Sequence, residues 1–290
     1  MKILRHLSLF FVISLVVLVP GIISLVVNGL RPSLDFTGGS LMELQLTREV
    51  PAAELQTALE KMYVVDSVIA TDRNSVIIRG EMLDNEKKIS VVAAISQLYG
   101  ATTVSRFESI GPTLGRELLM KTLAAVLLVS TLITLYVWKQ FREPQFGFSA
   151  ILAMLHDTLV LLGSFSILGY FWQVEVDVLF VTALLTTLSF SIHDTIVVFD
   201  RIRELRRRMS GVSLEDVANA AVVETLGRSV NNSLTIILML VALVVIGGES
   251  IRWFAVALLI GAVSGTYSST FTAVPLLVVW ERLKMRRKKA

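Results

Sequence analysis

Two acidic residues, Asp157 and Asp194, lie inside long apolar runs, where a helix crossing a membrane would carry no charge. Ionisable groups inside a membrane are costly, so they are functional candidates. Asp194 lies six positions before Asp200, and at ~1.5 Å per residue this places it about 9 Å inside the end of its helix. Thr187, Ser191 and Asp194 follow one another at spacings of four and three, on one helical stripe. We expect that stripe to face neighbouring helices or water rather than lipid.

A basic residue can reach the same depth as Asp194. The apolar core of the fifth span covers only 234–246, so this helix must draw in the preceding turns to reach the ~20 residues that cross a bilayer. Those turns contain Arg228, Asn231 and Asn232. Asp194 and Arg228 could form a fixed ion pair that only locks helix packing. They could instead form a titrating switch, because a nearby arginine favours the charged carboxylate whereas burial favours the neutral form.

Two other kinds of site are suggested by the dipeptides His156-Asp157 and His193-Asp194. A metal site is disfavoured, because adjacent residues point about 100° apart on a helix and lack the ligand spacing of helical metal sites. The chain has no cysteine, which excludes thiolate ligands and disulfides. The dyad of an intramembrane aspartic protease would need two carboxylates that share a proton, which a nearby arginine opposes. We therefore expect no metal, and Asp157 as a secondary relay or packing residue.

The apolar runs predict six membrane spans. Apolar residues make up 54% of the 290 positions and charged residues only 18%, which indicates the membrane class. The spans are expected at 7–27, 118–138, 148–170, 178–199, 230–246 and 253–280. The first should be retained, since it lacks a small-residue cleavage pattern. In the last, which could end in an interfacial turn near Pro275, Gly261 and Gly265 lie on one face and indicate close helix packing.

The basic residues predict the orientation of these spans. Six spans put both ends of the chain on one side, and Lys and Arg gather in the segments of that side, at Lys2, Arg5, Lys139, Arg142, 201–208 and 282–289. The opposite short loops hold no basic residue between 169 and 177 and only Arg252 near 247–251. The positive-inside rule then places both termini in the cytoplasm, with a linking helix near 200–227 and a basic C-terminal tail. This topology explains the arginine cluster without a nucleic-acid partner.

The polar segment 29–117 separates the first span, 1–28, from the remaining spans, 118–290, and this topology places it outside the cytoplasm. Periodicity and turn residues predict a strand at 40–46, a helix at 52–62, strands at 66–71 and 75–79 joined at 72–74, a helix at 84–99 and a strand at 102–109. That order is the one of a ferredoxin-like split βαβ unit. The segment has no His or Cys, and its carboxylates are scattered among basic residues. We expect a binding or docking module rather than a hydrolase.

Three motifs resemble the signatures of the SecD/SecF family of protein-export membrane proteins, in its SecF branch. They are DFTGG (Asp35, Phe36, Thr37, Gly38, Gly39), GPTLGREL (with Gly111, Pro112 and Gly115) and SIHDTIVVFDRIRE at 191–204. The resemblance covers nearly the whole chain, with the motifs in the expected order. It implies the fold of half an RND-superfamily transporter, an α-helical polytopic membrane protein with six transmembrane helices and one extracytoplasmic α+β ferredoxin-like domain.

The resemblance also implies a function. Such a subunit assembles with SecD in the cytoplasmic membrane of a bacterium or archaeon, associates with the SecYEG channel, and uses the proton motive force to assist preprotein export after the SecA step. In some relatives sodium replaces protons. YajC and YidC are further candidate partners, the extracytoplasmic domain would contact the preprotein, and membrane lipids surround the helices. No cofactor, nucleic acid or covalent chemistry is expected.

The family's ion-coupling Asp and Arg fall on Asp194 and Arg228, the residues that depth had already selected, with Asp157 and His193 as secondary candidates. His193 departs from the family, which usually has Asn before the Asp; a histidine titrates near pH 6.5. Two rival functions stay open. One is half of an RND-type small-molecule exporter, and the other is a passive scaffold of the translocase that needs the fold but not the charge.

Overall fold

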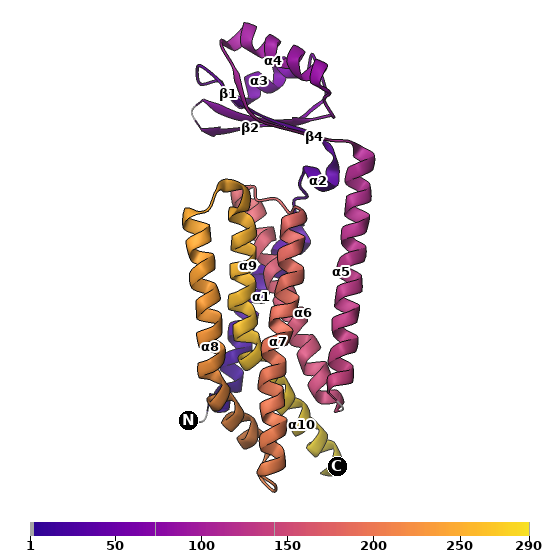
Figure 1. The fold of residues 1–290 in the computed structure, drawn as a ribbon, viewed down its shortest axis with the longest axis vertical. Coiled ribbons are helices and arrows are strands. Elements are labelled where there is room, and N and C mark those ends of the chain that lie inside the picture. Colours follow the sequence, from indigo (N-terminus) through magenta and orange to yellow (C-terminus); the bar gives the residue numbers. More distant parts are fainter. Residues whose placement is uncertain (1–2, 73, 142, 290) are drawn as a thin grey trace. The chain divides into compact units, whose positions relative to one another are not determined.

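The computed structural model describes residues 3–72, 74–141 and 143–289, so Lys2, Arg73 and Arg142, which entered the predictions above, lie outside the described residues. The chain forms two compact units. One comprises Met1–Arg31 with Ala125–Ala290, and the other is Pro32–Ala124 (Figure 1). The second unit ends later than the predicted 117, because helix α5 starts at Pro112 and its first turns belong to this unit.

The unit Pro32–Ala124 is a four-stranded sheet with helices. Its elements are α2 Leu34–Thr37, β1 Gly39–Gln45, α3 Ala52–Leu59, β2 Val65–Asp72, β3 Ser75–Gly80, α4 Asn85–Tyr99 and β4 Thr103–Ile110. The strand order is β2-β3-β1-β4 and every neighbouring pair is antiparallel, which confirms the ferredoxin-like prediction. Met42 pairs with Ile78 and Leu44 with Val76 across β1 and β3, and all four side chains are buried. Alternate residues of these strands therefore build the core under α3 and α4.

Among the described residues, six helices are long and apolar enough to cross a membrane, which confirms the predicted number of spans. They are α1 Leu7–Asn28, α5 Pro112–Gln140, α6 Pro144–Trp172, α7 Val178–Arg208, α8 Leu214–Ile246, and α9 Glu249–Ser268 continued by the π-helix Ser269–Ala273 and by α10 Val274–Lys289. Half of the most apolar window is buried in α6, α7 and in the last span, against 17% in α1 and α8 and none in α5. The helices α6, α7 and α9 thus form the core of the bundle.

Helix α1 lies along α6 and is joined to it at two small residues. A Cβ atom at Gly163 would come within 2.6 Å of the Gly21 Cα atom, so these helices touch backbone to backbone. One turn further along each helix, the hydroxyl oxygens of Ser24 and Ser166 lie 2.9 Å apart. Both side chains are buried, and the Ser24 hydroxyl also accepts a 3.2 Å hydrogen bond from the Asn28 side-chain amide.

The predicted linking helix near 200–227 is not a separate helix. Helix α7 continues to Arg208 and α8 begins at Leu214, so the segment consists of the ends of two membrane helices and the short turn between them. The Ser213 hydroxyl caps α8 by accepting a 3.1 Å hydrogen bond from the Asp216 backbone N–H. The apolar residues of this segment, including Val217 and Val222, pack into the bundle core.

The last span does not end at Pro275. A π-helix occupies Ser269–Ala273, and α10 follows through Lys289, so the predicted basic tail is helical. Proline has no backbone N–H to give to the preceding turn, and the wider π-turn before Pro275 accommodates that missing bond. The backbone hydrogen-bond pattern of the span therefore changes over one turn, and the helix continues without a break.

Candidate functional site

Asp157, near the middle of α6, is fully buried and is surrounded by hydroxyl groups from two other helices. Its carboxylate accepts hydrogen bonds from Ser191 of α7 and from Ser264 and Ser268 of α9, the Ser264 bond being 2.6 Å long. Hydrogen bonds to a charged acceptor are stronger than neutral ones. These four residues, the Asp157 cluster, join the three core helices at one point.

His156 extends the Asp157 cluster toward the surface of the bundle. Its Nδ1 atom lies 3.0 Å from Asp157 Oδ1, so these adjacent side chains meet, although we expected neighbouring side chains to diverge. The other ring nitrogen, Nε2, is buried without a hydrogen-bond partner among the described residues. The ring lies 6.3 Å from the ring of Tyr267 on α9 and lines a pocket of about 450 Å³ between α1, α6 and α9.

Asp194 has a separate setting at the contact between α7 and α8. Its side chain is 5% exposed, and Oδ2 accepts a 2.9 Å hydrogen bond from the Ser229 hydroxyl. Thr187 and Ser191 are buried on the same side of α7. The predicted stripe therefore faces helices rather than lipid, as expected. His193 points elsewhere, because its side chain is exposed.

Arg228 reaches the predicted depth, since the next residue, Ser229, is the one bonded to Asp194. Its own side chain is exposed, and within the described part of the chain no hydrogen bond or ion pair joins it to Asp194. It lines a polar pocket of about 560 Å³ at the arginine-rich ends of α7 and α8. Across this pocket Arg201 donates a 2.6 Å hydrogen bond to Glu224.

The structure assigns the two carboxylates to different surroundings. Asp157 binds hydroxyls of α7 and α9, and Asp194 binds a hydroxyl of α8, with no hydrogen bond between the two acids among the described residues. A dyad that shares one proton needs carboxyl groups in contact, so this arrangement gives no support to the intramembrane protease alternative. Sequence reasoning missed the serines Ser229 and Ser264; the four-residue spacing of Ser264 and Ser268 was the signal that could have found the second.

Gly261 and Gly265 lie where α9 packs on α7. A Cβ atom at Gly261 would come within 2.0 Å of the Thr187 hydroxyl oxygen, and one at Gly265 within 3.3 Å of the Phe190 ring and 3.4 Å of Ser191 Cα. Larger residues would push the helices apart. The two glycines therefore hold α9 close enough for its serines to reach Asp157.

The DFTGG and GPTLGREL motifs pack against each other inside the unit Pro32–Ala124. Gly38 has a φ of +71°, and a Cβ atom there would lie 2.8 Å from Pro112 Cα; one at Gly115 would lie 2.9 Å from the Gly38 nitrogen. Gly39 begins β1 opposite Ile110 at the end of β4. The other motif residues are Asp35, Phe36 and Thr37 in α2 and Gly111 just before α5. The two motifs form a tight joint at the start of α5.

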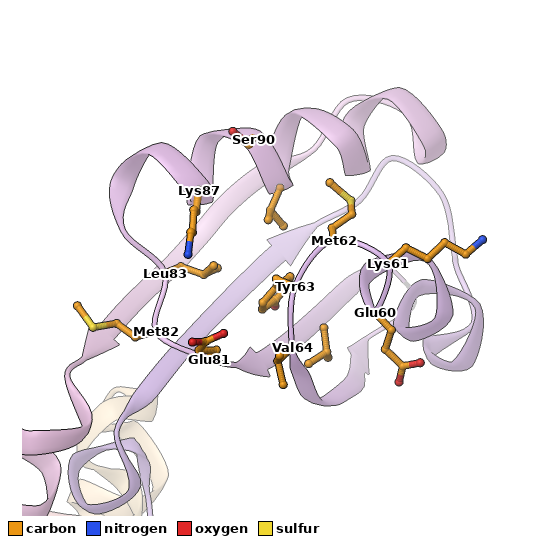
Figure 2. A pocket seen from close by; sticks show the side chains of 12 residues that line it. Glu60, Lys61, Met62, Tyr63, Val64, Glu81, Met82, Leu83, Lys87 and Ser90 are labelled. Atoms are coloured by element: carbon orange, nitrogen blue, oxygen red, sulfur yellow. The ribbon is translucent and has the colours of Figure 1, made fainter.

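The ferredoxin-like domain carries a pocket of about 670 Å³ beside α4 (Figure 2). Glu60, Lys61, Met62, Tyr63, Val64, Val65, Glu81, Met82, Leu83, Lys87, Ser90 and Val91 line it. Met62 and Met82 are each 46% exposed, on opposite sides of Tyr63 in this view. Burial and the Asp66 carboxylate hold the pKa of the Tyr63 phenol above its usual range, so the phenol stays neutral. Flexible methionines suit varied apolar side chains.

Comparison with known families and proteins places these features in context. Residues 90–283 match the family described as protein export membrane protein SecD/SecF, C-terminal, and residues 23–50 match the SecD/SecF GG motif. The chain is 41% identical over 289 residues to protein translocase subunit SecF of Thermobaculum terrenum, covering 94% of this chain and 91% of the relative. It is 39% identical over 290 residues to the SecF of Anaerolinea thermophila, covering 97% and 94%.

A solved structure is similar as well. The crystal structure of SecDF, a translocon-associated membrane protein from Thermus thermophilus, superposes with a TM-score of 0.83 at 30% identity. The superposition covers 97% of this chain but only 39% of the SecDF chain, so this chain spans about two fifths of that protein. Since the family match covers more than half of the residues and the SecF relatives align over nearly their whole length, the chain belongs to the SecD/SecF family of protein-export membrane proteins.

Proposed function

We propose that this chain is the SecF-type subunit of an accessory complex of the Sec translocase, which together with SecD couples ion flow across the cytoplasmic membrane to preprotein export. The observation that carries the proposal is Asp194, a carboxylate buried between two membrane helices with an arginine next to its hydrogen-bond partner. Ionisable groups in that position are characteristic of ion pathways and proton relays. Family membership supports the same function.

A switch can be built from the contact between α7 and α8. Asp194 now accepts a hydrogen bond from Ser229, whereas Arg228 lines the polar pocket. Adjacent positions differ by about 100° around a helix, so a turn of α8 against α7 would exchange Ser229 for Arg228 beside the carboxylate. The arginine would favour the charged form of Asp194, and burial away from the arginine would favour the neutral form. Binding and release of a proton would then be coupled to helix rotation.

The orientation of the chain in the membrane determines which partners each unit can contact. With the arginine-rich helix ends in the cytoplasm, the ferredoxin-like domain lies outside, where it contacts the emerging preprotein or SecD. The pocket with Met62 and Met82 suits apolar side chains of an unfolded polypeptide. SecD supplies the remainder of an RND-type pair, and SecYEG, with YajC and YidC, supplies the channel and its environment. The transported ion is the only small species required, and the subunit performs no covalent chemistry.

Preprotein translocation into inverted membrane vesicles tests this function. Wild type and Asp194→Asn are compared under an imposed and a collapsed proton gradient, after assembly of the complex has been checked. We expect Asp194→Asn to lose the gradient-dependent part of export. Asp84→Asn is the matched control, because Asp84 caps α4 through the Lys87 N–H and asparagine caps a helix equally well.

Two outcomes would overturn the proposal in different ways. If Asp194→Asn exports as well as wild type under the gradient, the carboxylate is structural and the chain is a passive scaffold whose energy enters elsewhere. If export is unchanged when the whole chain is deleted and the deletion strain becomes sensitive to small toxic compounds, the chain is half of a small-molecule exporter.

A further inference from the structure

The proposed function uses Asp194 and leaves the buried pair His156 and Asp157 without a role. All contact positions of the Asp157 carboxylate are filled, Oδ1 by His156 and Ser264, and Oδ2 by Ser191 and Ser268. A carboxylate offers about four lone-pair sites and is a pure acceptor only when ionised. The cluster is therefore built for an ionised Asp157 that faces a hydrogen on His156 Nδ1.

The same cluster has room for a protonated Asp157. The Ser268 Oγ atom lies 3.3 Å from the Gly265 carbonyl oxygen, so this hydroxyl can turn from the carboxylate to the backbone. That turn would free one carboxyl oxygen to carry a proton. The π-helix that begins at Ser269 follows directly, and single π-turns in α-helices occur often at functional sites.

His156 lines the pocket between α1, α6 and α9, and its second ring nitrogen lies beneath the pocket wall. This Nε2 atom is buried and has no partner among the described residues, which in a native structure calls for a functional explanation. The pocket, at about 450 Å³, has room for water, whose share of liquid volume is about 30 Å³. Because Nε2 is buried, a water molecule in this pocket reaches it only when a covering side chain moves.

The groups around His156 determine with which side chains it can exchange a proton. Helix α9 presents Tyr267, whose hydroxyl donates a 2.8 Å hydrogen bond to the Phe10 carbonyl, and α1 presents Ser14. None of the pocket-lining residues from α1 or α9 is charged. On α6 the titratable neighbour is Asp157, and on α7 it is Asp194, one helical turn beyond Ser191. Hydrogen bonds thus connect His156 and Asp157 to Ser191, and Asp194 follows Ser191 by three positions on the same helix.

We propose that His156 and Asp157 form a second proton-binding site in series with Asp194, and that the pocket between α1, α6 and α9 is where His156 exchanges its proton with water. This inference rests on the proposed function and adds a second binding site to the proton path through Asp194. A proton that binds Nε2 makes an imidazolium beside the ionised Asp157. Transfer of the Nδ1 proton to Asp157 leaves a neutral imidazole that carries its hydrogen on Nε2, and a neutral carboxyl group. When the proton returns from Asp157 to Nδ1, Nε2 releases its own proton, which restores the first state.

Infrared difference spectroscopy of the full chain in lipid nanodiscs tests the site without an export assay. In an Asp194→Asn background we expect a pH-dependent band of a protonated carboxyl group. Adding Asp157→Asn should remove the band, and adding His156→Gln should shift its midpoint by about one pH unit, because glutamine keeps a donor but cannot titrate. Ser149→Ala, another buried serine position on α6, is the control and should leave the band unchanged. Absence of the band in Asp194→Asn, or an unmoved midpoint with His156→Gln, overturns the proposal.

Vesicle export then separates this inference from the proposed function. We expect His156→Gln to lower gradient-dependent export at least about tenfold, a loss typical of a missing acid–base group. If Asp194→Asn removes that export while His156→Gln exports like wild type, the proposed function stands and the second site is overturned. If neither variant changes export, both fail.

Discussion

At the scale of single residues, the two buried carboxylates differ in how many hydrogen-bond partners each has. Asp157 has contacts on both oxygens from four side chains, whereas one hydrogen bond, from Ser229, is found for Asp194 within the described residues. Removing a hydrogen-bond donor from a carboxylate that has several donors is costly. A carboxylate that has one donor exchanges it more easily. Asp194 is thus better suited to exchange its partner during a helix rotation, whereas Asp157 stays joined to α7 and α9 through its serines.

His193 gives a prediction at this scale. The exposed His193 side chain precedes Asp194, and histidine is the side chain type whose charge changes most readily near physiological pH. We expect His193→Asn to leave export intact and to move the pH dependence of its gradient-driven part between about pH 5 and 8, because one titrating charge beside Asp194 is lost. Export rates of both proteins across that range provide the measurement. Loss of export at every pH would show that His193 does more than tune its neighbour.

The sequence predicted the depth of Asp194 and Arg228 along their helices, but not the side chains that each of them contacts. Depth along a helix follows from counting residues, so both positions could be selected without a structure. Which hydroxyl meets which carboxylate depends on the rotation of each helix, and one residue changes the direction by about 100°. That difference separates Ser229, which binds Asp194, from Arg228, which does not. The Asp157 cluster, drawn from three helices, was beyond prediction for the same reason.

At the scale of elements, the contact between α7 and α9 positions the buried polar groups. We expect Gly261→Ala to destabilise the protein by about 1–3 kcal/mol, because the added methyl would overlap Thr187. The thermal unfolding midpoint of the purified protein measures this change. Gly227→Ala is the control, since a Cβ atom there meets nothing within 4 Å and alanine favours a helix.

A second variant shows whether the α7–α9 contact itself is responsible. Adding Thr187→Ala to Gly261→Ala removes the hydroxyl and methyl that the new Cβ would meet, and should restore part of the lost stability. If the two losses simply add, the destabilisation arises elsewhere in α9.

Element boundaries were predictable where sequence periodicity and packing agree. The strands and helices of the ferredoxin-like domain follow the predicted order, because alternation in β1 and β3 reflects burial on one face. The ends of α7 and α8 were not predictable in this way. Their run of charges resembles a linker, but Val217 and Val222 are buried in the bundle, so the helices extend past the apolar segments.

At the scale of the whole molecule, the chain passes between its two compact units at only two places, after Arg31 and within α5. The proposed function requires the ferredoxin-like domain to move as the ion site cycles. The chain has no cysteine, so pairs of introduced cysteines can be oxidised without competing thiols.

We therefore predict that a series of disulfides linking the domain rigidly to the membrane unit reduces gradient-dependent export at least about tenfold, a loss of roughly 1.4 kcal/mol or more, and that reduction restores it. The same single-cysteine variants, which cannot form the link, are the controls. Unimpaired export with the link fully formed would rule out the motion.

The hydrogen bond between Ser24 and Ser166 limits how early the helix bundle can form during synthesis. Its two residues are 142 positions apart, and a ribosome adding about 5–20 residues per second needs roughly 7–30 s to make that length. For that interval α1 has crossed the membrane, but α6, which covers Gly21 and Ser24, does not yet exist. The first helix must therefore wait among lipids or insertion factors with its small polar face uncovered, and the bundle can close only when the third span arrives.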